Sequence, residues 1–175
     1  MTRAITTTRI VLSPFAETHV DSLLELFRDP HVRRYLLDDS LVDRAWVKEE
    51  VRTSRERFEA GSLGLYAAHL HEAPDALVGF AGFRPFYEPP VLQLVYGIAP
   101  AYVGRGLATE MARSVIDVAF NERGFRDVRA STDEPNRASV RVLERLGMTL
   151  VATGPGELWP QLHFALEPPA STGSE

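Results

Sequence analysis

Hydrophobic residues recur along this chain with two periods, the near-3.6-residue period of helices and the two-residue period of strands. The helical period places Val20, Leu23 and Phe27 on one face of a helix that stops at Asp29 and Pro30. The N-terminal half carries five predicted elements: a strand over residues 9–12, helices over residues 16–28 and 42–60, and strands over residues 63–70 and 77–83.

The N-terminal half also contains two predicted connections, and the C-terminal half contains six further predicted elements. Residues 31–40 show neither period, and residues 72–75 have the composition of a hairpin turn. The C-terminal half predicts a strand over residues 91–98, a helix over 107–121, a strand over 128–132, a helix over 136–146, and strands over 150–153 and 161–166. This order predicts an α/β (α+β) fold with a mixed sheet of six to seven strands and helices on both faces. We expect one domain over residues 1–167 and a disordered tail over residues 168–175.

The segment between the 91–98 strand and the 107–121 helix carries the strongest chemical signal. Gly104 and Gly106 let the backbone turn tightly and let a bulky anion approach free N–H groups. The first turn of the helix adds unpaired donors and the positive end of its dipole. The pattern therefore predicts a site for a cofactor that carries a diphosphate.

Three classes of cofactor use such a loop. A nucleoside-triphosphate loop needs Lys and then Ser or Thr after its last glycine, and here Leu107 and Ala108 follow. A dinucleotide site matches incompletely at Gly104, Gly106 and Thr109, although Asp133 lies where a ribose ligand is expected. The third class, an acyl-coenzyme A, also carries a diphosphate and is the one we favour.

Composition narrows the setting. The chain has 175 residues, no Cys and a net charge of −5, so disulfides and thiolate zinc sites are excluded and nucleic acid is disfavoured as a partner. No apolar run nears the ~20 residues of a membrane helix, and the N-terminus lacks the apolar stretch of a signal peptide. We therefore expect a cytoplasmic protein that does not bind membranes.

Two segments of the chain carry a recognisable pattern: residues 96–110, YGIAPAYVGRGLATE, and residues 136–148, NRASVRVLERLGM. Together, at this separation, they resemble the GNAT N-acetyltransferase superfamily, and within it the RimJ/RimL-type ribosomal-protein N-terminal acetyltransferases. The order of elements over residues 9–166 is also similar to that superfamily. The resemblance implies the GNAT fold, acetyl-CoA as co-substrate, no metal, and direct transfer of an acetyl group to a primary amine.

The resemblance also implies which residues hold the cofactor. The pantetheine arm is expected to add like a strand between the 91–98 and 128–132 strands, which must then diverge at their C-terminal ends. Asn136 is expected to cap its helix and to face that arm. The expected cofactor-binding residues are Ile98, Val103, Gly104, Arg105, Gly106, Leu107, Ala108, Thr109 and Asn136.

Three positions depart from the family pattern. Val103 stands where the superfamily places Gln or Arg, Gln93 where many members carry a Glu as general base, and Leu143 where many carry a Tyr as general acid. Ser139, one helical turn before Leu143, is the nearest hydroxyl. We take Gln93 and Ser139 as the candidate catalytic residues. Because Gln has no useful proton affinity near neutral pH, we expect activity to follow the pKa of the amine itself. This favours an α-amine, with a pKa of ~7.7–8.0, over a lysine at ~10.4.

Aromatic residues near these elements are candidates for the acceptor site: Tyr35, Phe83, Phe86 and Tyr87. His69 and His71 lack a third ligand nearby, so we favour a structural role over a metal site. A protein N-terminus and a small amino compound both remain open as acceptors, and so does a homodimer. The alternative from another class is a non-catalytic acyl-CoA-binding module.

Overall fold

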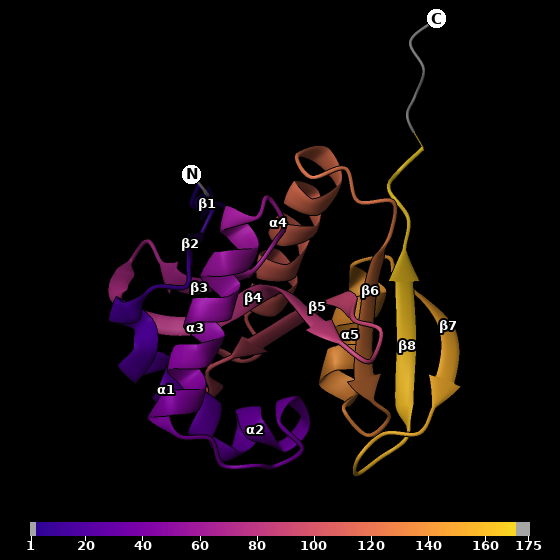
Figure 1. The fold of residues 1–175 in the computed structure, drawn as a ribbon, viewed down its shortest axis with the longest axis horizontal. Coiled ribbons are helices and arrows are strands. Elements are labelled where there is room, and N and C mark those ends of the chain that lie inside the picture. Colours follow the sequence, from indigo (N-terminus) through magenta and orange to yellow (C-terminus); the bar gives the residue numbers. More distant parts are fainter. Residues whose placement is uncertain (1–2, 171–175) are drawn as a thin grey trace, which may run out of the picture.

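The computed structural model describes residues 3–170 as one eight-stranded sheet with five α-helices packed against it (Figure 1). The strands are β1 (Ile5–Thr6), β2 (Ile10–Pro14), β3 (Leu65–Leu70), β4 (Ala73–Phe86), β5 (Val91–Ile98), β6 (Val128–Asp133), β7 (Thr149–Gly154) and β8 (Gln161–Leu166). The helices are α1 (Val20–Arg28), α2 (Pro30–Leu36), α3 (Arg44–Glu59), α4 (Leu107–Asn121) and α5 (Arg137–Arg145). No helix in this part of the chain is long and apolar enough to cross a membrane.

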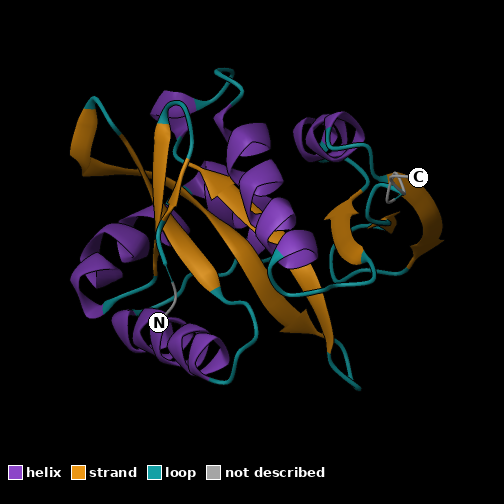
Figure 2. Cartoon of the chain, turned by 90° about the horizontal axis from the view of Figure 1, so that it is seen from above, coloured by secondary structure: helices purple, strands orange, loops and turns teal. Residues whose placement is uncertain are grey.

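Helices cover both faces of the sheet, as Figure 2 shows. On one face, α1, α2 and α3 bury an apolar layer against β3 and β4 that includes Leu23, Val47 and Phe80. On the other face, α4 and α5 bury Met111 and Leu143 in a second apolar layer, to which β3 and β4 also contribute from their opposite side. Since apolar area removed from water contributes roughly 25 cal/mol per Å², these two layers hold the sheet in place between them.

The strands follow the order β1-β2-β3-β4-β5-β6-β8-β7, and each neighbouring pair except one is antiparallel. The exception is the parallel pair β5–β6, which has a single register pair, Gln93 opposite Arg129. Beyond it the two strands point away from each other (Figure 1). We call this the β5–β6 divergence. The expected parting of these strands at their C-terminal ends is therefore confirmed.

The mixed sheet and the helices on both faces are confirmed, with eight strands where six to seven were expected. The strand β5 and the helix α4 have the predicted bounds. The additional strand, β1, has only two residues, too few for a two-residue period to be visible. Of the predicted tail, residues 168–170 have no regular structure and 171–175 lie outside the described residues.

Two connections were predicted wrongly. Residues 31–40 contain α2, because the Asp29 side chain accepts a hydrogen bond from the His31 N–H at 2.8 Å and Pro30 takes the first helical position. The turn before β4 is also shorter than predicted, since β4 already begins at Ala73, opposite Leu70. Register shifts around His69 accommodate the extra residues as bulges.

Candidate active site

The glycine loop, residues 103–106, connects β5 to α4 with its backbone open to solvent. Gly104 and Gly106 have φ angles of +80° and +74°, which favour glycine. A Cβ at Gly104 would have no heavy atom within 4 Å, and one at Gly106 would meet only Arg9 Nη2, at 3.7 Å. Because Gly106 is the N-cap of α4, the free N–H groups of the first helical turn lie beside this open backbone.

The loop is tied to the opposite edge of the sheet by Arg9, which precedes β2. Arg9 Nη1 donates to the Arg105 carbonyl at 2.9 Å, and Arg9 Nη2 lies 2.6 Å from a carboxylate oxygen of Glu110 in the first turn of α4. The Thr7 hydroxyl donates to the other oxygen at 2.6 Å. Burial would raise the pKa of Glu110, but the hydrogen bonds from Thr7 and Arg9 hold it below its usual value. We call this set of contacts the Arg9 clamp.

The remaining predicted cofactor residues differ in exposure. Val103 is exposed, while Leu107 is buried in the core and holds the start of α4 there. The Thr109 hydroxyl, also in the first turn, is buried and has no hydrogen-bond partner. An orphaned hydroxyl at this position leaves a donor for a ligand.

Asn136 caps α5, as predicted, because its side-chain oxygen accepts a hydrogen bond from the Ser139 N–H at 3.2 Å. The Ser139 hydroxyl lies 2.8 Å from the phenol oxygen of Tyr96 on β5. Burial raises the pKa of Tyr96 to about 12, so the phenol keeps its proton at neutral pH and can donate. Leu143 is buried in the core and supplies no polar group there. The Ser139–Tyr96 pair is thus the hydroxyl pair beside the β5–β6 divergence.

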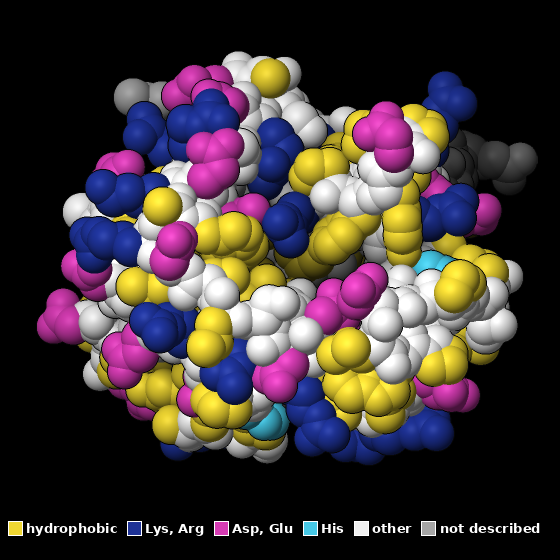
Figure 3. Space-filling model, turned by 60° about the horizontal axis from the view of Figure 1, so that its bottom comes forward, with side chains coloured by type: hydrophobic (Ala, Val, Ile, Leu, Met, Phe, Trp, Pro, Cys, Tyr) yellow, Lys and Arg dark blue, Asp and Glu magenta, His cyan; other side chains and the backbone are white. Residues whose placement is uncertain are grey.

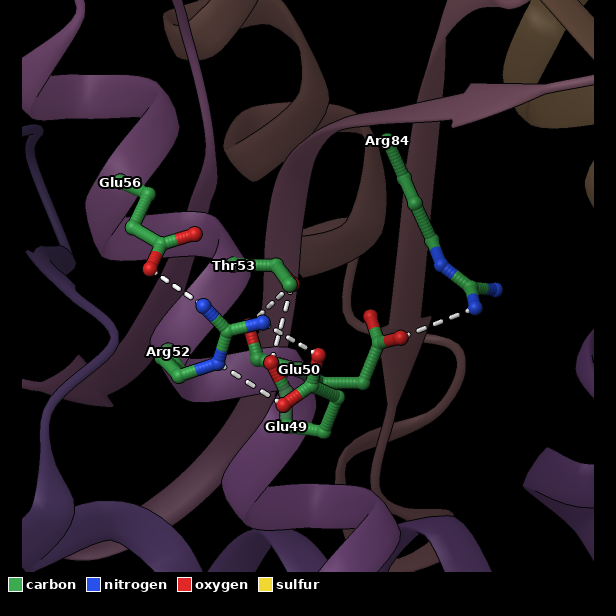
Figure 4. A network of polar contacts seen from close by, with 6 residues as sticks. All are labelled: Glu49, Glu50, Arg52, Thr53, Glu56 and Arg84. Carbon is green, nitrogen blue, oxygen red and sulfur yellow. Dashed lines mark hydrogen bonds and ion pairs between the residues drawn. The ribbon is translucent and has the colours of Figure 1, made fainter.

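Gln93 lies on the opposite face of β5 from Tyr96, as the two-residue period predicts, and is buried. Its antiparallel partner is Arg84, whose Nη2 donates to Glu50 at 2.9 Å. Figure 4 shows Arg84 reaching from β4 toward Glu50 on α3. Because Glu50 already balances the charge of Arg84, the neutral amide of Gln93 adds no third charge to this buried region.

A cavity of about 690 Å³ opens beside Gln93, and we call it the Gln93 cavity. On its wall, Ser131 Oγ lies 2.8 Å from His163 Nδ1 and 3.5 Å from the Tyr87 hydroxyl. The Tyr87 hydroxyl also donates to Gln161 Oε1 at 3.2 Å. Tyr87 has a φ of +69°, a conformation unfavourable for a non-glycine residue, so its placement over the cavity is maintained by the surrounding structure.

The other predicted acceptor residues divide into two groups. Phe86 shares the sheet face of Gln93, because the register places it opposite Val91. Phe83 does not, since it is fully buried and packs against Phe125, with ring centroids 5.4 Å apart. The expectation that Phe83 lines the acceptor site is therefore corrected: the pleat of β4 turns its side chain to the core side.

Tyr35 lies on α2 and packs against Trp159 of the β7–β8 loop, with ring centroids 5.2 Å apart. Arg34 lies over both rings, 5.2 Å and 6.0 Å from their centroids. Asp38, which follows α2, has its pKa raised by burial and by the nearby Glu157 of the same β7–β8 loop. The structure thus brings together α2 and a C-terminal loop that are far apart in the sequence.

Sequence reasoning considered Asp133 only as the ribose ligand of a dinucleotide site and did not connect it with acetyl transfer. Asp133 ends β6, is 3% exposed, and its Oδ2 has no hydrogen-bond partner. Burial raises its pKa, the Asp38 carboxylate raises it further, and a hydrogen bond from Gln161 opposes both. A signal was present in the alternation of Arg129, Ser131 and Asp133 with apolar residues, which places all three on one face.

Comparison with known proteins identifies the family. A family model for an acetyltransferase (GNAT) domain matches residues 9–149. The chain belongs to the GNAT acetyltransferase family. The protein YkkB of Bacillus subtilis (strain 168) is 33% identical to it over 125 residues, which cover 70% of this chain and 71% of YkkB.

Solved GNAT structures share the fold. A GNAT-family acetyltransferase from Bordetella pertussis has a TM-score of 0.82 at 20% identity and covers 94% of this chain and 99% of its own. RimL, a ribosomal L7/L12 alpha-N-protein acetyltransferase solved with coenzyme A, has a TM-score of 0.79 at 15% identity over 94% of this chain and 98% of its own. RimL-type enzymes are thus among the structural neighbours of this GNAT acetyltransferase.

The residues of this GNAT domain fit an acetyl-coenzyme A. The open backbone at Gly104 and Gly106 leaves room for a diphosphate, and the first turn of α4 supplies free N–H donors beside it. The β5–β6 divergence leaves backbone groups of both strands without a partner strand, which an extended amide-containing arm could pair with. These features belong to residues of this chain and agree with its assignment to the GNAT family.

We predict that Gly106→Val weakens coenzyme A binding at least tenfold, about 1.4 kcal/mol, because its side chain would fill the open space over the backbone donors. Isothermal titration calorimetry of coenzyme A measures this. Gly124→Val is the matched control: Gly124 has a φ of +66° near the other end of α4 and a similarly empty surrounding, so it shares the backbone strain alone. A folded Gly106→Val protein with wild-type affinity would contradict this placement of the diphosphate.

We predict that Asn136→Ala raises the KM for acetyl-CoA more than it lowers kcat, because Asn136 lies at the edge of the β5–β6 divergence. Losing a helix cap also costs about 1 kcal/mol of stability. Asp43→Ala controls for that loss, since Asp43 caps α3 by accepting from the Trp46 N–H. If steady-state kinetics show the wild-type KM for acetyl-CoA in both variants, Asn136 acts only as a helix cap.

Proposed function

We propose that this GNAT acetyltransferase transfers an acetyl group from acetyl-CoA to a primary amine, directly and without a metal, and that the acceptor is an α-amine. One observation carries the proposal. The β5–β6 divergence has the glycine loop and α4 beyond the end of β5, and the Gln93 cavity lies beside the one register pair, lined by residues 91–93 and 129–131 from both faces of the sheet. A donor and an acceptor can therefore approach one another through the sheet.

Binding and orientation account for much of the expected rate. The glycine loop and the first turn of α4 would hold the diphosphate, and the end of β5 around Ile98 would offer backbone donors to the carbonyl oxygen. Acetyl-CoA supplies the thioester carbonyl and a thiol of pKa near ~8.5, which leaves without strong protonation. Orientation of the two reactants by the chain can supply ~7–11 kcal/mol of the barrier reduction.

The Ser139–Tyr96 pair is our candidate for proton donation to the departing sulfur. The phenol of Tyr96 stays protonated at neutral pH and can donate to Ser139, 2.8 Å away. The Ser139 hydroxyl could then donate onward. This hydroxyl pair would take over the role of the Tyr that many family members carry where this chain has Leu143.

An α-amine is favoured because Gln93 can orient a nucleophile by hydrogen bonds but cannot remove its proton at neutral pH. The likeness to RimL, named for α-N-acetylation of a ribosomal protein, supports a protein N-terminus as one such acceptor. A small amino compound is the other, and the Gln93 cavity has room for it. We place the reaction in the cytoplasm on the composition of the chain.

A second candidate function is a non-catalytic acyl-CoA-binding module. The specific observation that favours it is the pair of side chains Gln93 and Leu143, which replaces the acid and base of many relatives. In that case the glycine loop would bind the cofactor and no thioester would be consumed.

An assay of thioester consumption separates the two functions. We predict thiol release from acetyl-CoA with amino-acid amides and short peptides, and slower release at pH 7 with lysine side-chain amines, because fewer of those are deprotonated. Mass spectrometry of the product should show one added acetyl group. Tight binding of acetyl-CoA with no turnover across the panel would favour the binding module.

We predict that Ser139→Ala lowers kcat about tenfold or more and leaves the KM for acetyl-CoA nearly unchanged. Tyr96→Phe should have a smaller effect, and the double variant should be no worse than Ser139→Ala, because the two hydroxyls act as one unit. Ser114→Ala is a control, since Ser114 bonds within α4 to the Met111 carbonyl. Additive losses in the double variant would show that Tyr96 acts independently of Ser139.

A further inference from the structure

Asp133 has a buried carboxylate oxygen that makes no hydrogen bond within the described part of the chain. The side chain is 97% buried by accessible area, since only 3% is exposed, and Oδ2 has no hydrogen-bond partner. An unpaired buried carboxylate is costly, and proteins tolerate one mainly where a ligand supplies the missing partner. The partner of a lone carboxylate oxygen is a cation or a hydrogen-bond donor.

The register places Asp133 beside the expected reaction centre. Gln93 lies opposite Arg129, and four residues further along each strand lie Gly97 and Asp133, on the two sides of the β5–β6 divergence. By alternation along β6, the Asp133 side chain is on the sheet face of Ser131, two residues beyond the last β6 residue that lines the Gln93 cavity. The carboxylate thus lies across from the end of β5, where the carbonyl of the donor is expected.

The surroundings of Asp133 are acidic and aromatic. Asp38 from the α2–α3 connection raises its pKa, and Glu157 from the β7–β8 loop acts on Asp38 in turn. Gln161 on β8 hydrogen-bonds to Asp133. Arg34, the cation on the adjoining part of α2, lies over aromatic rings rather than pairing with Asp133. Figure 3 shows a hollow in the side of the molecule that forms the bottom of Figure 1, with acidic side chains along one edge of the hollow.

We propose that Asp133 binds the ammonium group of the acceptor and takes its proton, so that Asp133, and not Gln93, is the base of the reaction. The inference rests on the proposed acetyl transfer from acetyl-CoA to a primary amine, replaces the expectation that the amine must arrive neutral, and names the acceptor as a cationic primary amine. One N–H bond of the ammonium breaks and one O–H bond forms on Asp133. The nitrogen lone pair is then free to attack the thioester carbon, and the second proton leaves with the thiol.

The charge of the surroundings suits this role. A negative potential from Asp38 and Glu157 attracts a cation and disfavours a second anion. Burial and Asp38 raise the pKa of Asp133, which brings it closer to the pKa of the amine and makes proton transfer less uphill.

The pH dependence of kcat/KM tests the assignment, measured with the amino-acid amide that the wild-type protein acetylates best. If Asp133 must be ionised and the amine must arrive protonated, the profile is a bell. Its acid limb follows the pKa of Asp133, and its basic limb falls above the amine pKa near ~8. The mechanism without a base, expected from Gln93 alone, gives a rise to a plateau and no basic limb. A plateau in the wild-type profile would overturn the assignment.

Two variants sharpen the test. Asp133→Asn should lower kcat/KM at pH 7 at least ~100-fold and turn the bell into a rise to a plateau. Calorimetry in the presence of coenzyme A should show at least tenfold weaker binding of the same amide. Asp38→Asn should move the acid limb to lower pH, because loss of a neighbouring negative charge lowers the pKa of Asp133. Asp117→Asn, on the exposed face of α4, is the matched control and should match the wild type.

The failure of this inference differs from the failure of the proposed function. If wild type acetylates the amide and Asp133→Asn does so with the same pH profile, Asp133 is not the base and the acetyltransferase assignment stands. If Asp133→Asn unfolds below the assay temperature, the position of the acid limb in the pH profile of Asp38→Asn is the test of Asp133 as the base. An acid limb that stays in place in Asp38→Asn would then reject Asp133.

Discussion

The parting of two parallel strands is the constraint on which the site depends. Every other strand pair in the described sheet runs antiparallel with an extended register, so the sheet is continuous up to β5 and again from β6 onward. Gln93 and Arg129 form the one register pair that joins these halves. Because unpaired backbone donors and acceptors need partners, the divergence both opens a passage through the sheet and supplies polar groups along its walls.

The two faces of that passage have different chemistry. On the α4 and α5 side lie the open glycine backbone, the helix N-terminus and the neutral Ser139–Tyr96 pair, which suit an anion and a leaving thiol. On the other side, Asp133 and its acidic neighbours suit a cation. In the proposed reaction, the sheet would keep the diphosphate of the donor and the ammonium of the acceptor apart until they meet at the divergence, which a single open pocket would not do.

The sequence predicted best the features set by short-range rules. The bounds of β5 and α4, the glycine turn and the Asn136 cap all follow from local periodicity and local backbone geometry. The start of α2 was missed although its signal was local, because Asp29 and Pro30 were taken only as the end of the preceding helix. A cap followed by proline can also begin a helix.

The features that depend on distant contacts could not be predicted in the same way. Phe83 and Phe86 differ by three positions, so the pleat sends them to opposite faces, and only the pairing with β5 shows which is the core face. Asp133 stands out because of its burial, and that burial comes from segments that precede and follow it by many residues. No pattern within β6 states that a carboxylate there will lack a partner.

The Arg9 clamp links the affinity of the cofactor site to the edge of the sheet. Glu110 places a negative charge in the first turn of α4, where it would repel a diphosphate. Arg9, which directly precedes β2, neutralises this charge. Coupling of this kind is reciprocal, because whatever stabilises one end stabilises the other by the same free energy. If the glycine loop binds the diphosphate as proposed, its occupancy would protect β1 and β2 from fraying, and fraying of this edge would weaken diphosphate binding. The short N-terminal hairpin would then be a remote part of the cofactor site.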